Sequence, residues 1–311
     1  MKSQLYRIAF GADAAGYIDQ DGYICFWNYN KGYIPLPTAL ASQPFASITA
    51  SRENNIFYIL TKVGQTIKLE LFDKHKDTRY TTVPRNNQTI SIEQLGKYLC
   101  SFIGLSDGSS IVTTDSPAHR PFIDYINKKH VIAISAKENN IVALTNDAIY
   151  LYAPANSYST CNPYKSIAIS RDCFSHGKIK QLSTTRNYTA ILFETGEIVK
   201  ISPNNLIEGI RYPVYDTTPL TSISAGKEHV IGLHKNGNII AWGDNSYQQH
   251  SIPDIQKDDI QYIHTEDNHN FAILKNQKIS NWGHTKATPI PPFLAALNKP
   301  FLYQGSFGGI I

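Results

Sequence analysis

The strongest constraint on the fold is a pattern that recurs along the chain at a nearly constant interval. Each of the three tryptophans, Trp27, Trp242 and Trp282, ends a short apolar run that follows a polar turn. Shifting the sequence by 40 residues places Trp282 on Trp242 and His269 on His229, and shifting it by 215 places Trp27 on Trp242. A period of about 40 residues indicates a repeat architecture, in which each unit packs against its neighbours.

Seven equivalent positions can be marked along the chain, 40 to 48 residues apart: Gly22, Gly64, Gly108, Ala148, Gly196, Gly237 and Gln277. The corresponding repeats cover residues 5–44, 45–88, 89–128, 129–177, 178–219, 220–257 and 258–300. They fill nearly the whole chain of 311 residues, so we expect a single domain over residues 1–311.

Each repeat has the same internal order of apolar runs and turns. In the sixth repeat, apolar runs at residues 223–225, 230–233 and 238–242 are separated by short polar segments. Runs of this length, split by Asn-Gly, Asp-Gly or Thr-Gly, predict strands joined by tight hairpins. Seven such units predict an all-β fold, a seven-bladed β-propeller of four-stranded antiparallel blades. The best helical candidate is residues 293–297.

The end of the chain resembles the start of an eighth repeat. Gly305 falls on Gly226, but the chain stops at Ile311. Because open sheet edges favour unwanted pairing, a ring of blades has to be closed. We expect residues 301–311 to add a strand to a blade shared with the N-terminal segment.

Composition and charge limit the class of protein. With 42% hydrophobic residues and a net charge of +4, the chain should fold, and it does not require a nucleic-acid partner. No apolar stretch is long enough to span a membrane, and the N-terminus lacks a signal-peptide core. We therefore expect a monomer in the cytoplasm, without direct nucleic-acid binding.

Chemistry-bearing motifs are weak throughout. The four cysteines lack C-x-x-C spacing, so we expect reduced thiols, with a Cys161–Cys173 disulfide as the alternative. Four metal-capable residues lie close in sequence but not on one helical face: His264, Glu266, Asp267 and His269. Since these four span a strand end and a tight turn, we expect no metal. We also expect no cofactor, and neither a nucleophile elbow nor a phosphate-binding glycine loop occurs. No catalytic residue is assigned.

Residues 223–249, followed by Pro253, resemble one repeat of the regulator of chromosome condensation family. The match includes Ala225-Gly226, His229, the Asn236-Gly237 turn, Trp242-Gly243, Asn245 and Gln249, while Gln248 stands where the family has glycine. The first and seventh repeats resemble the unit less closely, and the second to fifth are eroded. The resemblance implies a seven-bladed propeller. The uneven erosion favours a bacterial or viral relative that acts inside a host cell, delivered without a classical signal peptide.

The recurring residues are first of all structural. We expect Gly226 where the backbone turns or approaches another blade. His229 and His269 should bridge strands within their own blades by hydrogen bonds. The tryptophans should pack between blades.

The long fourth interval contains the main irregularity. Extra residues between 152 and 178 should form a surface loop, and loops of repeat proteins often carry binding. We assign partner binding to Tyr158, Tyr164, Lys165, Arg171 and Asp172. The alternative is an insertion without a function.

The resemblance implies a protein partner. The leading hypothesis is a propeller that activates a small GTPase such as Ran by promoting guanine-nucleotide exchange, which needs no cofactor. The alternative is a non-catalytic binding or inhibitory propeller, as in the propeller-type β-lactamase inhibitors of this repeat class. A third hypothesis is an enzyme with its site at the channel mouth.

Overall fold

The structure of the chain is a computed structural model. It describes residues 8–10, 14–19, 21–28, 32–37, 40, 43–51, 56–71, 79–82, 88–95, 98–104, 110–138, 140–154, 164–170, 177–202, 208–209, 218–256, 259–276 and 278–284.

The described chain folds into seven antiparallel sheets, each built from consecutive strands. Four sheets have four strands. These are sheet 1, β1 (Ile8–Phe10), β2 (Ala14–Ile18), β3 (Ile24–Asn28) and β4 (Gly32–Ile34); sheet 2, β5 (Phe45–Ser51), β6 (Ile56–Thr61), β7 (Thr66–Glu70) and β8 (Arg79–Thr82); sheet 4, β12 (Val131–Lys137), β13 (Asn140–Thr145), β14 (Ala148–Pro154) and β15 (Tyr164–Ser170); and sheet 5, β16 (Ile179–Thr184), β17 (Thr189–Phe193), β18 (Ile198–Ile201) and β19 (Glu208–Gly209).

In the other three sheets, three strands lie within the described residues. These are sheet 3, β9 (Gln88–Leu95), β10 (Tyr98–Gly104) and β11 (Ser110–Thr114); sheet 6, β20 (Leu220–Ala225), β21 (His229–His234) and β22 (Ile239–Gly243); and sheet 7, β23 (Ile260–Glu266), β24 (His269–Leu274) and β25 (Ile279–Gly283). The expectation of four strands in every blade is therefore met in four sheets.

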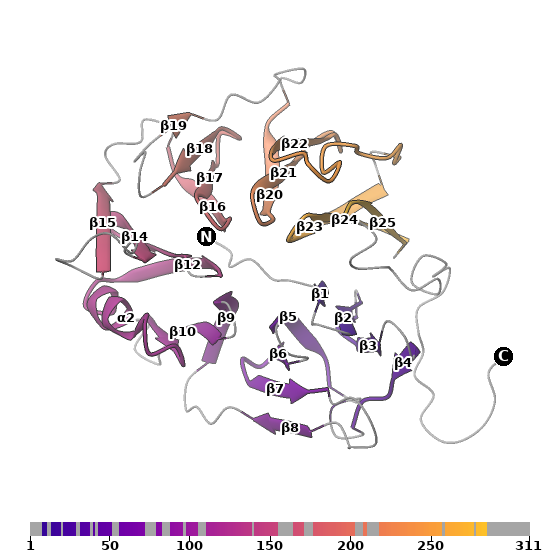
Figure 1. Ribbon diagram of the computed structural model, residues 1–311, viewed down its shortest axis with the longest axis horizontal. Helices are drawn as coiled ribbons and strands as arrows, with labels where there is room; N and C mark the ends of the chain where they lie inside the picture. The colour runs from indigo at the N-terminus through magenta and orange to yellow at the C-terminus, as the bar shows by residue number, and fades with distance from the viewer. Residues whose placement is uncertain are drawn as a thin grey trace.

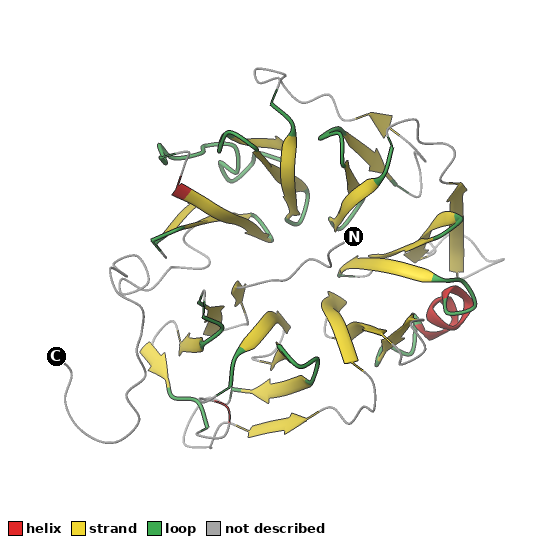
Figure 2. Ribbon diagram, turned by 180° about the vertical axis from the view of Figure 1, so that it is seen from behind, coloured by secondary structure: helices red, strands yellow, loops and turns green. Residues whose placement is uncertain are grey.

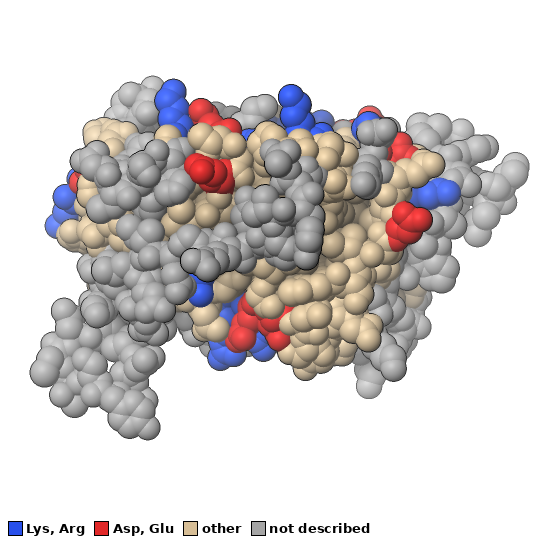
Figure 3. All heavy atoms as spheres, turned by 90° about the horizontal axis from the view of Figure 1, so that it is seen from above, with Lys and Arg blue, Asp and Glu red and all other residues tan. Residues whose placement is uncertain are grey.

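The sheets stand around a common centre in chain order, with the first strand of each sheet innermost (Figure 1; Figure 2 from behind). Seven sheets arranged in this way match the predicted number of blades. In the edge-on view of Figure 3, basic and acidic side chains lie next to one another, consistent with the small net charge of +4.

The core lies between neighbouring sheets. Every residue of β2, β17 and β21 is buried, so these second strands contact apolar surface on both faces. Each tryptophan packs with the second strand of a neighbouring sheet, namely β24 for Trp27, β17 for Trp242 and β21 for Trp282. The predicted packing of tryptophans between blades is confirmed. Since Trp27 belongs to sheet 1 and β24 to sheet 7, apolar contact joins the first sheet to the last.

Tight turns connect the strands as predicted. At the β21–β22 turn, Gly237 has φ +83°, a conformation that side-chain-bearing residues rarely adopt. The chain therefore reverses within the few residues that separate the two strands.

One helix, α2 (Arg120–Ile126), was not predicted. It follows β11, and its buried residues Phe122, Ile123 and Ile126 pack with side chains of sheets 3 and 4. Pro121, within its first turn, and the short length conceal the helical pattern, although the apolar spacing 122, 123 and 126 is the signal that could have found it. The predicted helix 293–297 and closing strand 301–311 lie outside the described residues.

Asn127, directly after α2, covers the outer edge of β11. The Val112 N–H donates to Asn127 Oδ1 (2.7 Å), and Asn127 Nδ2 donates to the Val112 carbonyl (2.8 Å). One amide side chain thus satisfies both backbone groups that a further strand would have paired.

Substituting Asn127→Ala should lower the free energy of unfolding by roughly 2 kcal/mol, because both Val112 groups lose their partner. Urea unfolding measures this change. The matched control is Lys128→Ala, an exposed neighbour whose removal should change stability by less than about 0.5 kcal/mol. Equal effects of the two substitutions would contradict the role of the Asn127 side chain.

Candidate functional site

The inner strands converge on a small cavity that is partly open to solvent. Its lining comes from β1, β5, β12, β16, β20 and β23, so six of the seven inner strands contribute. The lining residues lie toward the ends of these strands, where each chain turns into its second strand. We call this cavity the channel mouth, and the side of the ring that carries these turns the hairpin face.

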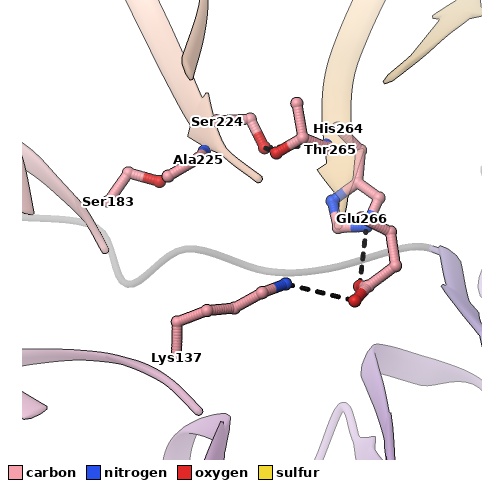
Figure 4. A network of polar contacts seen from close by, with 7 residues as sticks. All are labelled: Lys137, Ser183, Ser224, Ala225, His264, Thr265 and Glu266. Carbon is pink, nitrogen blue, oxygen red and sulfur yellow. Dashed lines mark hydrogen bonds and ion pairs between the residues drawn. The ribbon is translucent and has the colours of Figure 1, made fainter. Parts of the chain in front are cut away.

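An ion pair joins opposite sides of the channel mouth. Lys137, the last residue of β12, places Nζ 3.1 Å from Oε1 of Glu266, the last residue of β23 (Figure 4). Their side chains are only 15% and 10% exposed. Partial burial weakens solvent screening, so the attraction is stronger than in a surface pair. The pair connects sheet 4 to sheet 7.

His264 lies beside this pair and is buried. Its Nε2 is 3.8 Å from Glu266 Oε2, too long for a hydrogen bond. Burial lowers the pKa of His264, which the nearby Glu266 opposes. The neutral imidazole is therefore favoured, and Lys137 and Glu266 together give the channel mouth no net charge.

Hydroxyl groups link neighbouring inner strands around the channel. Ser183 Oγ accepts a hydrogen bond from the Ala225 N–H (2.9 Å), and Ser224 Oγ accepts one from the Thr265 N–H (2.9 Å). These contacts join sheet 5 to sheet 6 and sheet 6 to sheet 7 (Figure 4). Each contact has the same geometry, so the repeat extends to the polar groups at the axis.

The turns of the hairpin face are also linked in series. The Arg186 N–H donates to the Lys227 carbonyl (2.9 Å), and the Lys227 N–H donates to the Asp267 carbonyl (2.7 Å). A Cβ at Gly226 would collide with the Asp267 carbonyl and with the His229 ring. The predicted close approach of Gly226 to another blade is confirmed, and it permits this contact between turns.

His229 bridges two sheets, which corrects the prediction that it bridges strands within one. Its Nε2 lies 2.6 Å from Oδ1 of Asn270 on β24, in sheet 7. The ring also lies against Gly226, in the turn between β20 and β21 of its own sheet. His269, in contrast, meets Asn281 of its own sheet (3.0 Å), as predicted.

The His229 contact continues into the loop after β22. Asn270 Nδ2 and Trp282 Nε1 both donate to the Gln249 carbonyl (2.9 and 2.8 Å), and the Gln249 side chain donates to Asp244 (2.9 Å). Burial lowers the pKa of His229 to about 4, although its bond to Asn270 acts in the opposite direction. His229 is thus held neutral inside an inter-sheet network.

The predicted partner-binding residues are placed only in part. Tyr164 and Lys165 begin β15, where they pair with Pro154 and Ala153 of β14, so they belong to a regular outer strand rather than a loop. The alternation from Ile167 to Ser170, with Ile169 buried and its neighbours exposed, was the missed signal of this strand. Tyr158, Arg171 and Asp172 lie outside the described residues.

The pairing of β14 and β15 shows on which side of the ring the end of β14 and the start of β15 lie. Ile141 at the start of β13 pairs with Tyr152, so Pro154 and Tyr164 lie at the end of sheet 4 that carries the Lys137–Asn140 turn. The end of β14 and the start of β15 therefore lie at the hairpin face.

Other candidate chemistry is limited in the described part of the chain. No group of three or more His, Cys, Asp or Glu side chains there could hold a metal ion. Cys25 and Cys100 are free thiols, while Cys161 and Cys173 lie outside the described ranges. Ser116 Oγ is 2.6 Å from His119 Nδ1, but both residues are buried, so this pair is closed to a substrate. None of the helices in the described ranges has the length and apolar character of a membrane-spanning helix.

Comparison with known proteins supports the repeat pattern found in the sequence. A family model described as regulator of chromosome condensation (RCC1) repeat matches residues 220–249. In sequence, the chain is similar to the guanine nucleotide exchange factor SRM1 of Saccharomyces cerevisiae, with 24% identity over 134 residues, 34% of this chain and 28% of the relative. The match thus spans little more than a quarter of that relative's length.

Solved structures show the fold more broadly. Human WBSCR16 is similar with a TM-score of 0.65 and 11% identity over 88% of this chain and 87% of the other. Prp20p from Saccharomyces cerevisiae is similar with a TM-score of 0.59 and 11% identity, over 93% of this chain and 83% of the other. The CRINKLY WD40 ectodomain of the Arabidopsis thaliana receptor kinase ACR4 is similar with a TM-score of 0.56 and 11% identity, over 90% of this chain and 97% of the other. These similarities show a β-propeller.

The free energy of unfolding should fall by up to about 3 kcal/mol as the pH decreases from 6.5 to 4. In this range the unfolded chain protonates His229 at its ordinary pKa of 6.5, whereas the folded chain, with a pKa of about 4, does not. His264 contributes in the same direction. Urea unfolding at several pH values measures the slope.

A His229→Gln variant should show a shallower slope than the wild type over this pH range, whatever its stability at pH 7. The exposed His130→Gln variant is the control and should keep the wild-type slope. Identical slopes for all three proteins would rule out His229 as a source of the pH dependence.

Proposed function

We propose that this chain, a divergent propeller of the regulator of chromosome condensation repeat class, binds a small GTPase and promotes release of its guanine nucleotide. Ran is the first GTPase to test. The observation that carries the proposal is the sequence match to the exchange factor SRM1. Prp20p, similar in fold over 93% of this chain, has known binding properties to Gsp1p and histones.

The mechanism follows from linkage between two binding equilibria. A protein that binds the nucleotide-free GTPase more tightly than the loaded form must weaken nucleotide affinity by the same factor. The chain needs no cofactor for this activity, only a surface that keeps its shape. Contacts such as Ser183–Ala225 and Lys227–Asp267, which join neighbouring sheets, support such a preorganised surface.

The hairpin face is the docking surface in this proposal. Its turns hold one another in place, and the end of β14 and the start of β15 lie at it. We assign partner contact to the segment around the β14–β15 connection, with Tyr158, Tyr164, Lys165, Arg171 and Asp172 as the contacting residues. Tyrosine and arginine are frequent at the centres of protein interfaces. The protein would act as a monomer in the cytoplasm.

A second candidate function is non-catalytic binding or inhibition. In the matching repeat, His229, Trp242 and Gln249 all serve contacts between sheets. The match of residues 220–249 to the family model therefore reflects residues that hold the propeller together. An inhibitory scaffold and an exchange factor would both need such residues.

Substoichiometric amounts of the full chain should accelerate release of a fluorescent GDP analogue from purified Ran by at least about tenfold. Stopped-flow fluorescence in the presence of excess unlabelled GDP measures the rate. Binding to Ran without acceleration would favour the non-catalytic function, and absence of binding would exclude Ran as the partner.

Replacing residues 155–163 with a Gly-Ser linker of equal length should weaken GTPase binding at least about tenfold, because it removes Tyr158. The stability should stay within about 0.5 kcal/mol of wild type, because β14 and β15 are retained. A longer deletion reaching residue 172 would remove β15 itself and so is unsuitable. Biolayer interferometry and urea unfolding give the two measurements.

The control is the same replacement at residues 72–78, which connect β7 to β8 at the corresponding position of sheet 2. It should leave binding unchanged. Wild-type affinity after replacement of residues 155–163 would exclude that segment, and a further Arg171→Ala/Asp172→Ala variant would then test the residues that follow β15.

A further inference from the structure

We propose that the channel mouth binds a small zwitterion, such as a free amino acid, between the Lys137 ammonium and the Glu266 carboxylate. This site is separate from the proposed GTPase function, and neither depends on the other. The inference comes from three observations, namely a pair of opposite charges held side by side, their partial burial and the cavity in which they lie.

The two charges are held at fixed positions by the ring. Lys137 ends the inner strand of sheet 4 and Glu266 ends that of sheet 7, with Nζ and Oε1 3.1 Å apart (Figure 4). The Thr265 N–H is bonded to Ser224, which anchors β23 directly before Glu266. The channel mouth therefore presents a positive pole and a negative pole at a constant separation.

Burial distinguishes this pair from a surface ion pair. Lys137 and Glu266 are 15% and 10% exposed, compared with 32% and 33% for Lys68 and Glu70 on β7, which also form an ion pair. Charges that are less screened by water interact more strongly with each other and with a ligand. The same burial makes it costly to add a net charge to the site.

These electrostatics select the ligand class. A carboxylate that approaches Lys137 also meets the negative Glu266, and an ammonium group at Glu266 meets the positive Lys137. A zwitterion places its carboxylate near Lys137 and its ammonium near Glu266, so that the four charges alternate in sign. Both contacts are charge-assisted, and the site stays neutral. The neutral His264 adds no charge that would disturb this arrangement.

The cavity limits the size of the ligand and provides further contacts. The cavity is small and partly open to solvent. Thr49 also lines it, whereas the lining residues Ile8 and Ile48 are almost fully buried in the cores between the sheets. The site therefore suits a ligand as small as glycine, whose two charged groups reach the two poles.

Isothermal titration calorimetry on the full chain tests the proposal with glycine, acetate and methylammonium as separate probes. We expect glycine to bind, and acetate and methylammonium to bind at least about tenfold more weakly, since each satisfies only one pole. Equal affinity for acetate and glycine would overturn the proposal in favour of an anion site. No heat of binding with glycine up to about 10 mM would overturn it outright.

Substitutions locate the site. Lys137→Met and Glu266→Gln should each weaken glycine binding at least about tenfold, whereas Lys68→Met and Glu70→Gln, the matched control pair, should leave it unchanged. Wild-type glycine affinity in Lys137→Met or Glu266→Gln would place binding elsewhere. Circular dichroism checks folding. If a variant fails to fold, the three-probe comparison on the wild-type chain still decides between a zwitterion site, an anion site and no site.

Discussion

Burial of second strands on both faces is the constraint on which the rest of the structure depends. The strands β2, β17 and β21 are buried at every residue, so each of their sheets needs an apolar neighbour on both sides. A row of such sheets would expose one bare face at each end. The cluster of Trp27 with Phe271 and Ile273 removes that exposure by placing the first sheet against the last. Since a fully buried large apolar side chain stabilises the fold by about 1.5–3 kcal/mol, contact of the two ends is strongly favoured.

Polar contacts near the axis add direction to this packing. Apolar faces alone would let neighbouring sheets slide, because hydrophobic contact is not directional. The hydroxyls of Ser183 and Ser224 each accept a backbone N–H from the next sheet, and a buried N–H without a partner costs about 1–3 kcal/mol. Sliding of one sheet would break these bonds, so they set the relative position of neighbouring inner strands. These hydrogen bonds between neighbouring inner strands make the ring rigid. Both the docking surface and the two fixed charges at the channel mouth depend on that rigidity.

The sequence could predict what is local and repeated. The number of sheets, the turn at Gly237 and the packing of the tryptophans follow from periodic patterns of residue type. The ion pair of Lys137 with Glu266 could not be found in this way, because it joins positions 129 residues apart that share no motif. His229 was wrongly predicted to bridge strands of its own sheet for a related reason. A repeat pattern shows that a residue recurs, but not whether its side chain faces its own sheet or the next.

Helix α2 was missed because it departs from the common repeat at the rim of the ring, and β15 was missed because it follows a long connection that hides this regular fourth strand. The amide of Asn127 shows why such departures are tolerated there. One donor and one acceptor at the correct spacing suffice to finish the edge of β11, whatever backbone carries them. The periphery of this protein can therefore diverge in sequence and even in type of secondary structure, while substitutions at the hub are restricted. New binding specificities would be expected to evolve from the circumference inward.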